Sequence, residues 1–572
     1  MQMSSRHIVA VVVVLVGAAL VFTLIDRTEA QSSPAALTGV VSSPQEAQME
    51  GVLVSAKRAG STITTTVATD AQGRYTFPRT RLEPGTYSIR IRAIGYDLDG
   101  PSSVEVAGQQ PAQLDLRLRK TQDLAAQLSN GEWFMSWPGS VEMKNGLLNC
   151  TQCHGLNLIA RSRYTAKEWP AVLDRMGRYS QGSVPGRPQL RPGRASGNPI
   201  LAQSMSGREG EAPVRGELIA KTAEYLATVN LSSSPTWSYE LKTYPRPKGK
   251  ATRVVVTEYD LPRPEAMPHD AAADASGMVW YADFGSQVLG VLNPKTAEVI
   301  DYPMPITKPG APLGSLDLVL DKQGNIWMGT MYQGSLAKFD VKSKTFQTWG
   351  SPTFKERDEA RIAMVMPINH DVDGQVWIGG DSEYQVDVKT GQWKAIDYAT
   401  GLKDSSILRE LSSYGVASDS KNNFYGLNLN ATYIIRVDAK TKQVTPFPTP
   451  TPNAGPRRGH MDAQDRLWFA EFRANKIGMF DTRTEKFREF AVPTPWTNVY
   501  DAIADTAGYA WAGGMNNDRI VRVNTTSGET VEYLLPRATN IRRVNVDNAT
   551  SRPTFWVGNN LGATIIKVEA LE

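Results

Sequence analysis

The spacing of apolar and polar residues changes character along this chain and divides it into three regions. In residues 36–119, short segments alternate with a period of two or run as continuous β-branched stretches, at 52–56, 74–77, 86–91 and 113–118. Turn-forming Gly, Pro and Asp residues separate these segments. This pattern is typical of a small antiparallel sandwich, and we expect residues 36–119 to form one.

Residues 121–231 carry helical signals instead. Thr165 and Glu168 form a capping-box pattern in front of a segment, 169–176, whose apolar residues recur at helical spacing. A loop rich in Pro, Gly and Arg follows, and residues 216–229 are expected to form a closing helix. The sequence therefore predicts a small helical domain between two β regions.

Residues 250–572 repeat one local frame, Asp-x-x-Gly/Asn-x-hydrophobic-aromatic, followed by a turn and a second strand. The aromatic positions are 43 to 50 residues apart and are Trp280, Trp327, Trp377, Phe424, Trp468, Trp511 and Trp556. Repeats of this length are typical of β-propeller blades, so seven frames predict seven blades. Residues 254–259 are expected to close the ring against the last blade, which removes a free edge. The predicted fold class is therefore mainly β and multidomain, with a sandwich, a helical domain and a seven-bladed propeller.

The first 30 residues have the pattern of an export signal. Arg6 and His7 precede an apolar run at 8–25, and a small residue stands near Ala30. The run has 18 residues, the lower limit for a membrane-spanning helix. A cleaved signal and an uncleaved inner-membrane anchor both remain open, and both predict that the body of the protein is periplasmic or otherwise exported.

Composition narrows the chemistry that the chain can carry. The 62 basic and 58 acidic residues leave a net charge of +4, which gives no reason to expect a nucleic acid partner. The chain has two cysteines, Cys150 and Cys153, so no disulfide framework is available elsewhere. It has five histidines, so a metal site built from several of them would need most of the histidines in the chain.

Both cysteines belong to the run Cys150-Thr151-Gln152-Cys153-His154. On one helical turn, two thiols at this spacing face the vinyl groups of a haem, and the adjacent imidazole reaches the iron axially. A bare redox dithiol does not need the histidine, and a zinc site would need a second pair of thiols. We therefore expect one covalently attached haem c.

The sixth iron ligand has two candidates, Met176 in the expected helix and Met205 in the loop before the closing helix. The stretch CTQCHGLNLIARSRYTAKEWPAVLDRMGRY resembles the cytochrome subunit of sulfite dehydrogenases and the haem domains of quinohaemoprotein amine dehydrogenases. A helix with Trp and Arg-Met or Lys-Met recurs in those families, so the resemblance favours Met176. Plain core packing at helical spacing is the competing interpretation of Met176.

The two β regions also resemble known families. Residues 36–119, with TDAQGRYTFPRTRLEPGTYSIRIRAIGY, resemble the carboxypeptidase regulatory-like (transthyretin-like) module, which implies a structural or adhesive role. About 310 residues of the third region, with MPHDAAADASGMVWYADFGSQVLGVLNP in its first blade, are similar to virginiamycin B lyase (streptogramin lyase). That resemblance implies a seven-bladed propeller.

In the lyase family, two adjacent blades carry Pro-His, one histidine is the catalytic base and two acids hold magnesium. Only Pro268-His269 matches this pattern here, and Asp283 can replace one of the acids. Met267 stands where the other acid is expected. The resemblance therefore implies His269 and Asp283 as a catalytic pair beside an incomplete metal site.

Positions expected at the mouth of the propeller channel are unusually polar. One interpretation is a site for a polar or anionic ligand, with His269 and Asp283 beside arginines that bind its charge. The other is that propeller axes are polar because they hold water. The candidate ligand-binding residues are Arg457, Arg458, Glu471, Tyr500, Asp501 and Arg542.

Three functions follow from these patterns. The leading hypothesis is an exported cytochrome that transfers electrons, serves an oxidoreductase or dehydrogenase activity, and meets a redox partner protein or a small polar substrate. The second is a lyase that acts on a cyclic peptide or ester and carries the haem as an appendage. The third is a non-catalytic binding or scaffold protein.

Overall fold

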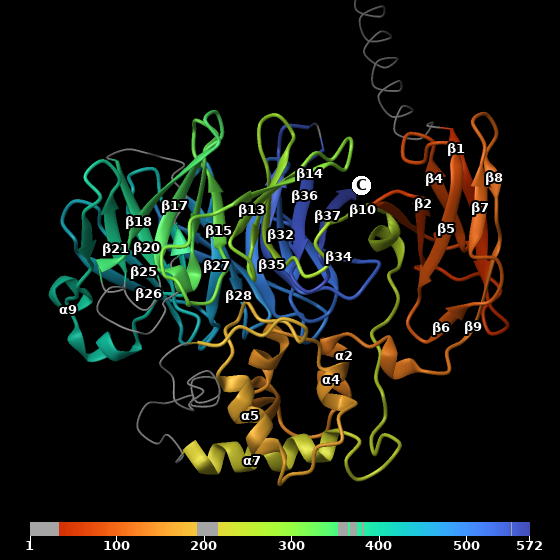
Figure 1. Ribbon diagram of the computed structural model, residues 1–572, viewed down its shortest axis with the longest axis horizontal. Coiled ribbons are helices and arrows are strands. Elements are labelled where there is room, and N and C mark those ends of the chain that lie inside the picture. Colours follow the sequence, from red (N-terminus) through yellow and green to blue (C-terminus); the bar gives the residue numbers. More distant parts are fainter. Residues whose placement is uncertain (1–33, 192–214, 353–363, 366–373, 380–382, 551) are drawn as a thin grey trace, which may run out of the picture.

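The computed structural model contains the three predicted regions and describes residues 34–191, 215–352, 364–365, 374–379, 383–550 and 552–572. Figure 1 shows the helical domain against one face of the propeller and the sandwich beside the ring. The predicted signal or anchor, residues 1–30, and Met205 lie outside the described residues. Within the described residues, no helix combines the length and the apolar character needed to cross a membrane.

The N-terminal region is a sandwich of two sheets, as predicted, but it is not purely antiparallel, because β1 pairs in parallel with β8 and β9. One sheet has the order β4-β1-β9-β6, with β8 also paired to β1, and the other contains β3-β2-β5-β7. Alternate residues such as Leu37, Phe77 and Leu118 are buried between the sheets because successive strand residues point to opposite faces. The strands are β1 (Ala35–Ser42), β2 (Leu53–Arg58), β3 (Ile63–Ala68), β4 (Arg74–Pro78), β5 (Gly85–Arg92), β6 (Tyr96–Leu98), β7 (Ser103–Val106), β8 (Ala112–Gln113) and β9 (Leu116–Lys120).

The C-terminal region consists of antiparallel four-stranded blades. Their innermost strands contact one another in a closed cycle, which defines a propeller. The first three blades are β11 (Pro268–Ala273), β12 (Val279–Asp283), β13 (Val288–Leu292) and β14 (Val299–Pro303); β15 (Leu316–Leu320), β16 (Ile326–Gly329), β17 (Ser335–Asp340) and β18 (Thr345–Gly350); and β19 (Met364–Val365), β20 (Gln375–Gly379), β21 (Tyr384–Asp387) and β22 (Trp393–Ala395).

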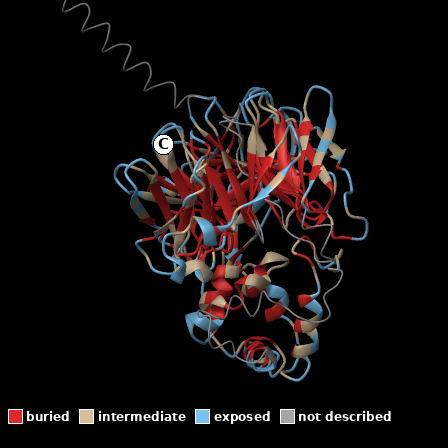
Figure 2. Cartoon of the chain, turned by 90° about the vertical axis from the view of Figure 1, so that its left-hand side faces the viewer, coloured by how far each residue is buried: buried red, intermediate tan, exposed pale blue. Residues whose placement is uncertain are grey.

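The remaining blades complete the ring of seven, and their core strands are almost entirely buried (Figure 2). They are β23 (Gly415–Ser418), β24 (Phe424–Leu427), β25 (Tyr433–Val437) and β26 (Val444–Pro448); β27 (Pro456–Met461), β28 (Arg466–Glu471), β29 (Lys476–Asp481) and β30 (Lys486–Ala491); β31 (Val499–Ala504), β32 (Tyr509–Gly514), β33 (Arg519–Asn524) and β34 (Thr530–Leu534); and β35 (Ile541–Asp547), β36 (Thr554–Asn559) and β37 (Thr564–Ala570) with β10 (Val254–Asp260). Short helical segments η4 (Gly249–Thr252), η5 (Met331–Gln333), α9 (Tyr398–Gly401) and η6 (Ser405–Glu410) lie between these strands.

The strand β10 closes the ring, as the sequence predicts. It pairs antiparallel with β37, so that the N-terminal strand of the propeller completes its last blade. The structure adds a contact that the sequence did not predict: the other edge of β10 pairs with β3 of the sandwich, with Val256 opposite Thr66. Blade seven and half of the sandwich therefore form one continuous eight-stranded sheet.

The aspartate of the repeated frame has a clear structural role. In blade one, Asp274 Oδ1 accepts the backbone N–H groups of Ser276 and Met278, and Asp274 Oδ2 accepts the indole N–H of Trp280 at 2.8 Å. Blades two, five and six repeat the bond to the indole at 2.7–3.0 Å. The aspartate thus fixes the turn and the large aromatic side chain together, which explains why the frame spaces them six residues apart.

The helical domain packs as a separate small core against the propeller. Trp133, Phe134 and Trp137 are large side chains buried in this core, and Tyr500 and Met515 of the propeller belong to the same apolar cluster. Its elements are η2 (Leu124–Ala126), α2 (Asn130–Ser136), α3 (Val141–Asn145), η3 (Leu148–Gln152), α4 (Asn157–Ala160), α5 (Trp169–Gly177) and α7 (Arg215–Val229).

Candidate functional site

The Cys-x-x-Cys-His run lines a pocket of the helical domain. Cys150 lies in the 3-10 helix η3, and Cys153 follows it as the C-terminal cap. The sequence led us to expect an ordinary helical turn here, and the tighter 3-10 turn takes its place. The pocket has a volume of about 530 Å³, and both cysteines and His154 contribute to its wall.

The two thiols are free, and burial controls their acidity. Desolvation raises the pKa of Cys150 to about 12, and the neighbouring Cys153 adds to this effect. Desolvation also raises the pKa of Cys153, against the opposing influence of the Arg542 and Arg191 guanidinium groups. A reactive dithiol needs a lowered thiol pKa, so the environment is unfavourable for thiol–disulfide exchange.

His154 is oriented by its own loop. Its Nδ1 lies 3.0 Å from the carbonyl oxygen of Gly155. Because a carbonyl oxygen only accepts hydrogen bonds, Nδ1 carries the proton and donates it to Gly155. In this tautomer, Nε2 keeps its lone pair free. A histidine that ligates a metal through Nε2 usually has its Nδ1 hydrogen-bonded to such a backbone carbonyl.

Met176 lines the same pocket as the two cysteines. It belongs to α5, together with the pocket residues Trp169 and Leu173, and its side chain is 37% exposed. A methionine whose only role was core packing would be buried, as Trp169 and Leu173 are. The structure therefore brings the predicted ligand Met176 to the pocket that holds Cys150 and His154.

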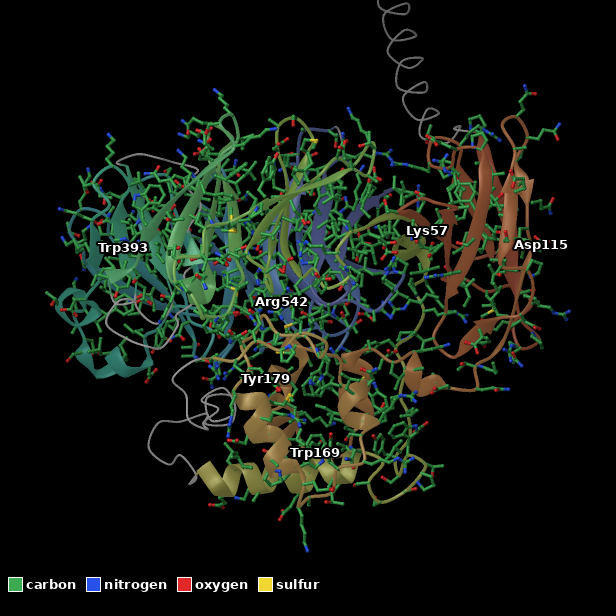
Figure 3. All side chains as sticks on the ribbon, viewed as in Figure 1. Lys57, Asp115, Trp169, Tyr179, Trp393 and Arg542 are labelled. Atoms are coloured by element: carbon green, nitrogen blue, oxygen red, sulfur yellow. The ribbon has the colours of Figure 1, made fainter. Side chains whose placement is uncertain are left out.

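Blade seven of the propeller binds the backbone of this cysteine loop directly. Asn540 Nδ2 donates to the carbonyl of Thr151 at 3.0 Å, and Arg542 Nη2 donates to the carbonyl of Gln152 at 2.8 Å. Arg542 Nε donates to Asn540 Oδ1 at 2.7 Å, so the two side chains support each other. Figure 3 shows Arg542 at the junction of the propeller and the helical domain. Arg542, predicted to bind a ligand, binds the protein's own loop.

The helical domain covers the channel face of the propeller through further contacts. Gly131 N donates to the carbonyl of Asn516 at 2.6 Å, and Phe134 stacks on Trp496 with ring centroids 4.9 Å apart. Gln189 Nε2 donates to the carbonyl of Gly285 at 3.0 Å. These contacts join segments more than 90 residues apart, so local sequence patterns carry no signal for them.

His269 is completely buried beneath this cover. Its Nδ1 lies 2.8 Å from Asp270 Oδ2, its Nε2 lies 3.2 Å from the Tyr500 hydroxyl, and its ring stacks on Phe284. Burial, together with the nearby Arg542 and other arginines, lowers the pKa of His269 well below its ordinary value. The ring is therefore neutral, and it has two hydrogen-bond partners within the protein.

Asp283 does not provide the carboxylate partner of His269 that we expected. Its Oδ2 forms an ion pair with Arg263 at 2.6 Å, and its Oδ1 accepts the backbone N–H groups of Met267 and Gly285 at 3.3 and 2.9 Å. Asp270, the residue next to the histidine, takes the place beside the imidazole. The expected pairing is corrected for a physical reason: Arg263 and two backbone donors already occupy the carboxylate of Asp283.

Arg458 and Asp501 are members of a buried ionic network in the channel. Both oxygens of Asp317 accept hydrogen bonds from Arg458, and Arg543 Nε lies 3.6 Å from Asp317. Asp501 Oδ2 lies 2.9 Å from His460 Nε2 and 3.3 Å from Arg543 Nη1. Burial opposes ionisation of Asp501, but Arg543 and His460 outweigh it and lower its pKa to about 2. These ion pairs join residues of several blades inside the ring.

Arg457 differs from Arg458 because aromatic rings rather than a carboxylate surround it. Its guanidinium carbon lies 4.0, 4.2 and 5.1 Å from the ring centroids of Tyr500, Phe472 and Tyr414. Burial alone would raise the pKa of Tyr414, but Arg457 and Arg458 lower it to about 7. Tyr500, whose hydroxyl is 3.0 Å from that of Tyr414, has a pKa raised by burial and by this neighbour.

Glu471 is the one predicted channel residue whose side chain lacks a hydrogen-bond partner among the described residues. Its exposed fraction is 0%, and neither carboxylate oxygen is hydrogen-bonded. Burial, and then the nearby Glu489, raise the pKa of Glu471 to about 8. The group is therefore mainly protonated near neutral pH and becomes a buried anion above pH 8, which Lys476 compensates only in part.

Replacing Glu471 with Gln should stabilise the protein in alkaline solution. When the pKa of a carboxyl is higher in the folded than in the unfolded state, ionisation of that group destabilises the folded protein. The protein therefore loses stability as the pH rises from the ordinary pKa of the group, 4.5, through the folded value of about 8. The variant should match the wild type near pH 5 and exceed it by about 1–3 kcal/mol near pH 9. Urea denaturation at several pH values measures this difference.

The matched control is the same change at Glu83, whose side chain is 75% exposed. Glu83→Gln should leave the pH dependence of unfolding as it is in the wild type. If the stability of the wild type and of Glu471→Gln changed with pH in the same way, Glu471 would not be the cause of the loss of stability in alkaline solution.

Metal-binding geometry is not found in the channel. Within the part of the chain that the structure describes, no three His, Cys, Asp or Glu side chains come together in a group that could hold a metal ion. In the channel, His460 has Asp501 as its partner. Reasoning from the sequence missed Asn540, and the only available signal was its position two residues before Arg542.

Comparison with known proteins gives two family matches. The carboxypeptidase regulatory-like domain family matches residues 36–119, and the virginiamycin B lyase family matches residues 401–570, which extend to the end of the last blade. Among curated proteins, none matches the chain.

Solved structures that are similar to this chain include lyases of low identity. A streptogramin B lyase structure is 19% identical, with a TM-score of 0.47, over 56% of this chain and 99% of that chain. A catalytically inactive virginiamycin B lyase from Staphylococcus aureus with quinupristin is 18% identical, with a TM-score of 0.46, over 55% and 99%. The selenomethionine-substituted lyase from the same organism is 20% identical, with a TM-score of 0.45, over 55% and 99%.

Proposed function

We propose that this chain is an exported electron-transfer protein that carries one haem c in its helical domain. One observation carries the proposal: Cys150, Cys153, His154 and Met176 all line a single pocket of about 530 Å³. This volume lies within the usual range for ligand and cofactor pockets, roughly 300–1,000 Å³. The raised pKa of both thiols argues against the alternative of a redox dithiol.

The residues of the pocket fit a covalent haem. The Cys150 and Cys153 sulfur atoms would form the thioether bonds, and Nε2 of His154 and the Met176 sulfur would bind the iron. A haem, when bound, supplies one-electron oxidation and reduction. The Gly155 carbonyl holds His154 in the tautomer that presents Nε2, and the buried side chains of Trp169, Leu173 and Leu226 exclude water from the pocket.

The outer rim of the pocket is suited to a redox partner protein. Leu158, Tyr164 and Met176 line the pocket and are 37–50% exposed, which is unusual for large apolar side chains. The opposite side of the loop is closed by the propeller through Arg542. A partner would therefore approach from the rim, and electrons would pass there in the periplasm or another exported compartment.

Lyase activity in the propeller is the second candidate function, because residues 401–570 match the virginiamycin B lyase family. His269 would be its base. However, the imidazole is completely buried under the helical domain, and Asp270 and Tyr500 already bind both of its nitrogens. A cyclic peptide could reach His269 only if the helical domain moved away.

A spectroscopic experiment distinguishes the two functions. The full chain is produced in a host with haem-maturation machinery, and its reduced-minus-oxidised spectrum and pyridine haemochrome are recorded. One haem c per chain, reduced by a partner protein or an added substrate, supports electron transfer. A colourless protein that cleaves virginiamycin in a metal-dependent manner supports the lyase.

Met176→Ala should remove the sixth ligand of the proposed haem. We expect the methionine-to-iron absorption band of the oxidised protein to disappear and the reduction potential to fall, because a thioether ligand raises the potential. Visible absorption and redox titration measure these effects. Met205→Ala is the matched control, and loss of the band in that variant alone would reassign the ligand.

A further inference from the structure

The segment that forms most of the cysteine pocket carries a large excess of positive charge. Residues 150–191 contain seven basic and two acidic residues, an excess of five, whereas the whole chain has a net charge of only +4. The neighbouring helix α7, which packs against α5, adds two basic and two acidic residues and leaves this excess unchanged. The basic residues are Arg161, Arg163, Lys167, Arg175, Arg178, Arg187 and Arg191, and the acidic ones are Glu168 and Asp174.

Ion pairs neutralise only part of this charge. Arg161 and Arg178 each form an ion pair with an aspartate at 2.6 Å. Arg163, Lys167 and Arg175 are exposed, and their side chains have no ion-pair or hydrogen-bond partner among the described residues. These three positive charges are therefore accessible to a second molecule.

The three cations stand beside the pocket. Arg175 is one of its lining residues and directly precedes Met176 in α5. Arg163 directly precedes the lining residue Tyr164, and Lys167 follows Tyr164 by three residues, which span at most about 11 Å. We call the surface formed by these cations and the exposed apolar residues of the pocket the basic rim.

Exposed apolar side chains share this surface. Among the described residues, nine large apolar side chains are exposed, and four of them belong to residues 150–191. Leu158, Tyr164 and Met176 line the pocket, and Leu190 forms a β-bridge with the lining residue Tyr179. Exposed apolar side chains with charged neighbours are typical of a surface that binds another macromolecule.

We propose that the basic rim docks an acidic electron-transfer protein. The inference rests on the electron-transfer function proposed above and names the charge of the partner. Complementary charge speeds the encounter of two proteins and orients them, and the exposed apolar side chains would then pack against the partner. One electron passes between the two redox groups, so that one is oxidised as the other is reduced, and no covalent bond changes.

A basic and apolar surface is also suited to an anionic membrane. The position of the rim favours the protein partner instead. The predicted signal or anchor leads into strand β1, which enters the sandwich at the end remote from the helical domain. The rim therefore lies away from the point at which a membrane anchor would attach.

The experiment follows electron transfer from an acidic flavodoxin to the full haem-loaded chain. Reduced flavodoxin is mixed with the oxidised protein, and the haem absorbance is recorded by stopped flow. Raising the salt concentration from about 20 mM to about 500 mM should slow the second-order reaction by about tenfold or more, because dissolved ions screen exposed charges. At the lower salt concentration, the Arg163→Glu, Lys167→Glu, Arg175→Glu triple variant should react about tenfold or more slowly than the wild type.

The matched control makes the same change in net charge elsewhere. The Lys322→Glu, Lys342→Glu, Lys440→Glu triple variant places it at exposed turns of blades two and four, and should slow the reaction by less than about threefold. Equal rates for the two triple variants, or a wild-type rate that does not depend on salt, would overturn the docking proposal. If pyridine haemochrome analysis shows haem in those samples, the electron-transfer function itself stands; a colourless wild type would overturn both.

A second measurement needs no variant and so does not depend on how a variant folds. The reduced wild type is oxidised by hexacyanoferrate(III), an anion, and by tris(phenanthroline)cobalt(III), a cation. Added salt should slow the first reaction and accelerate the second, and the reverse result would overturn the proposal. Binding to phosphatidylglycerol vesicles, together with a flavodoxin reaction that salt does not affect, would overturn it in favour of a membrane.

Discussion

When it is produced in a haem-maturing host, the Cys150→Ser, Cys153→Ser double variant should retain no covalently attached porphyrin. Both thioether bonds of a haem c need a cysteine sulfur, and the chain has no other cysteine to replace them. The wild type should keep its pigment through extraction with acidified organic solvent, and the variant should lose all of it. Absorbance of the protein after extraction, and its pyridine haemochrome, measure the difference.

The serine variant is a conservative test because the two side chains are similar in size. Ser61→Ala, at a half-buried loop position of the sandwich, is a suitable control and should retain the full haem content. A wild-type protein that is colourless, or that loses its pigment on extraction, would contradict the haem assignment. In that case the pocket around Met176 would need another occupant.

Arg458→Met should destabilise the propeller by about 3–5 kcal/mol, which is the effect of removing one partner of a buried ion pair. Arg458 and Asp317 have side chains only 2% and 1% exposed, and Arg458 binds both oxygens of that aspartate. The variant would leave Asp317 with Arg543 alone, at 3.6 Å. Urea denaturation followed by tryptophan fluorescence measures the loss.

Two further variants show whether the missing charge is the cause. Adding Asp317→Asn to Arg458→Met should recover part of the lost stability, because no unpaired carboxylate then remains buried. Lys250→Met removes one partner of a pair that is more than half exposed, and should change stability by less than about 1 kcal/mol. Equal losses for Arg458→Met and Lys250→Met would contradict the assigned role of the buried network.

The architecture was largely predictable because residues close together in the sequence determine most of its elements. The aspartate and aromatic residues of each frame act within a single turn, as the bond between Asp274 and Trp280 demonstrates. The strand at 254–259 could be assigned to ring closure because a free propeller edge is unfavourable. The pairing of β10 with β3 could not be predicted, since it joins residues nearly 200 positions apart and has no local signature.

The candidate site was predictable only where its parts are close in sequence. Cys150, Cys153, His154 and Met176 lie within 27 residues, and the structure brings them to one pocket. The pairing of His269 with Asp283 failed because the sequence does not show that Arg263 reaches the same carboxylate. The role of Arg542 was missed for a similar reason: its partner is a backbone carbonyl 390 residues away.

The continuous eight-stranded sheet has a consequence for how an anchored form of this protein would face a membrane. Strand β1 runs parallel to β9, and β9 leads into the helical domain, so the chain enters the sandwich at the end remote from that domain (Figure 1). The backbone hydrogen bonds between β3 and β10 attach the sandwich directly to the propeller, so it is not a module joined only by a flexible linker. A tether at the N-terminus would therefore join the sandwich at the end remote from the helical domain and its cysteine pocket.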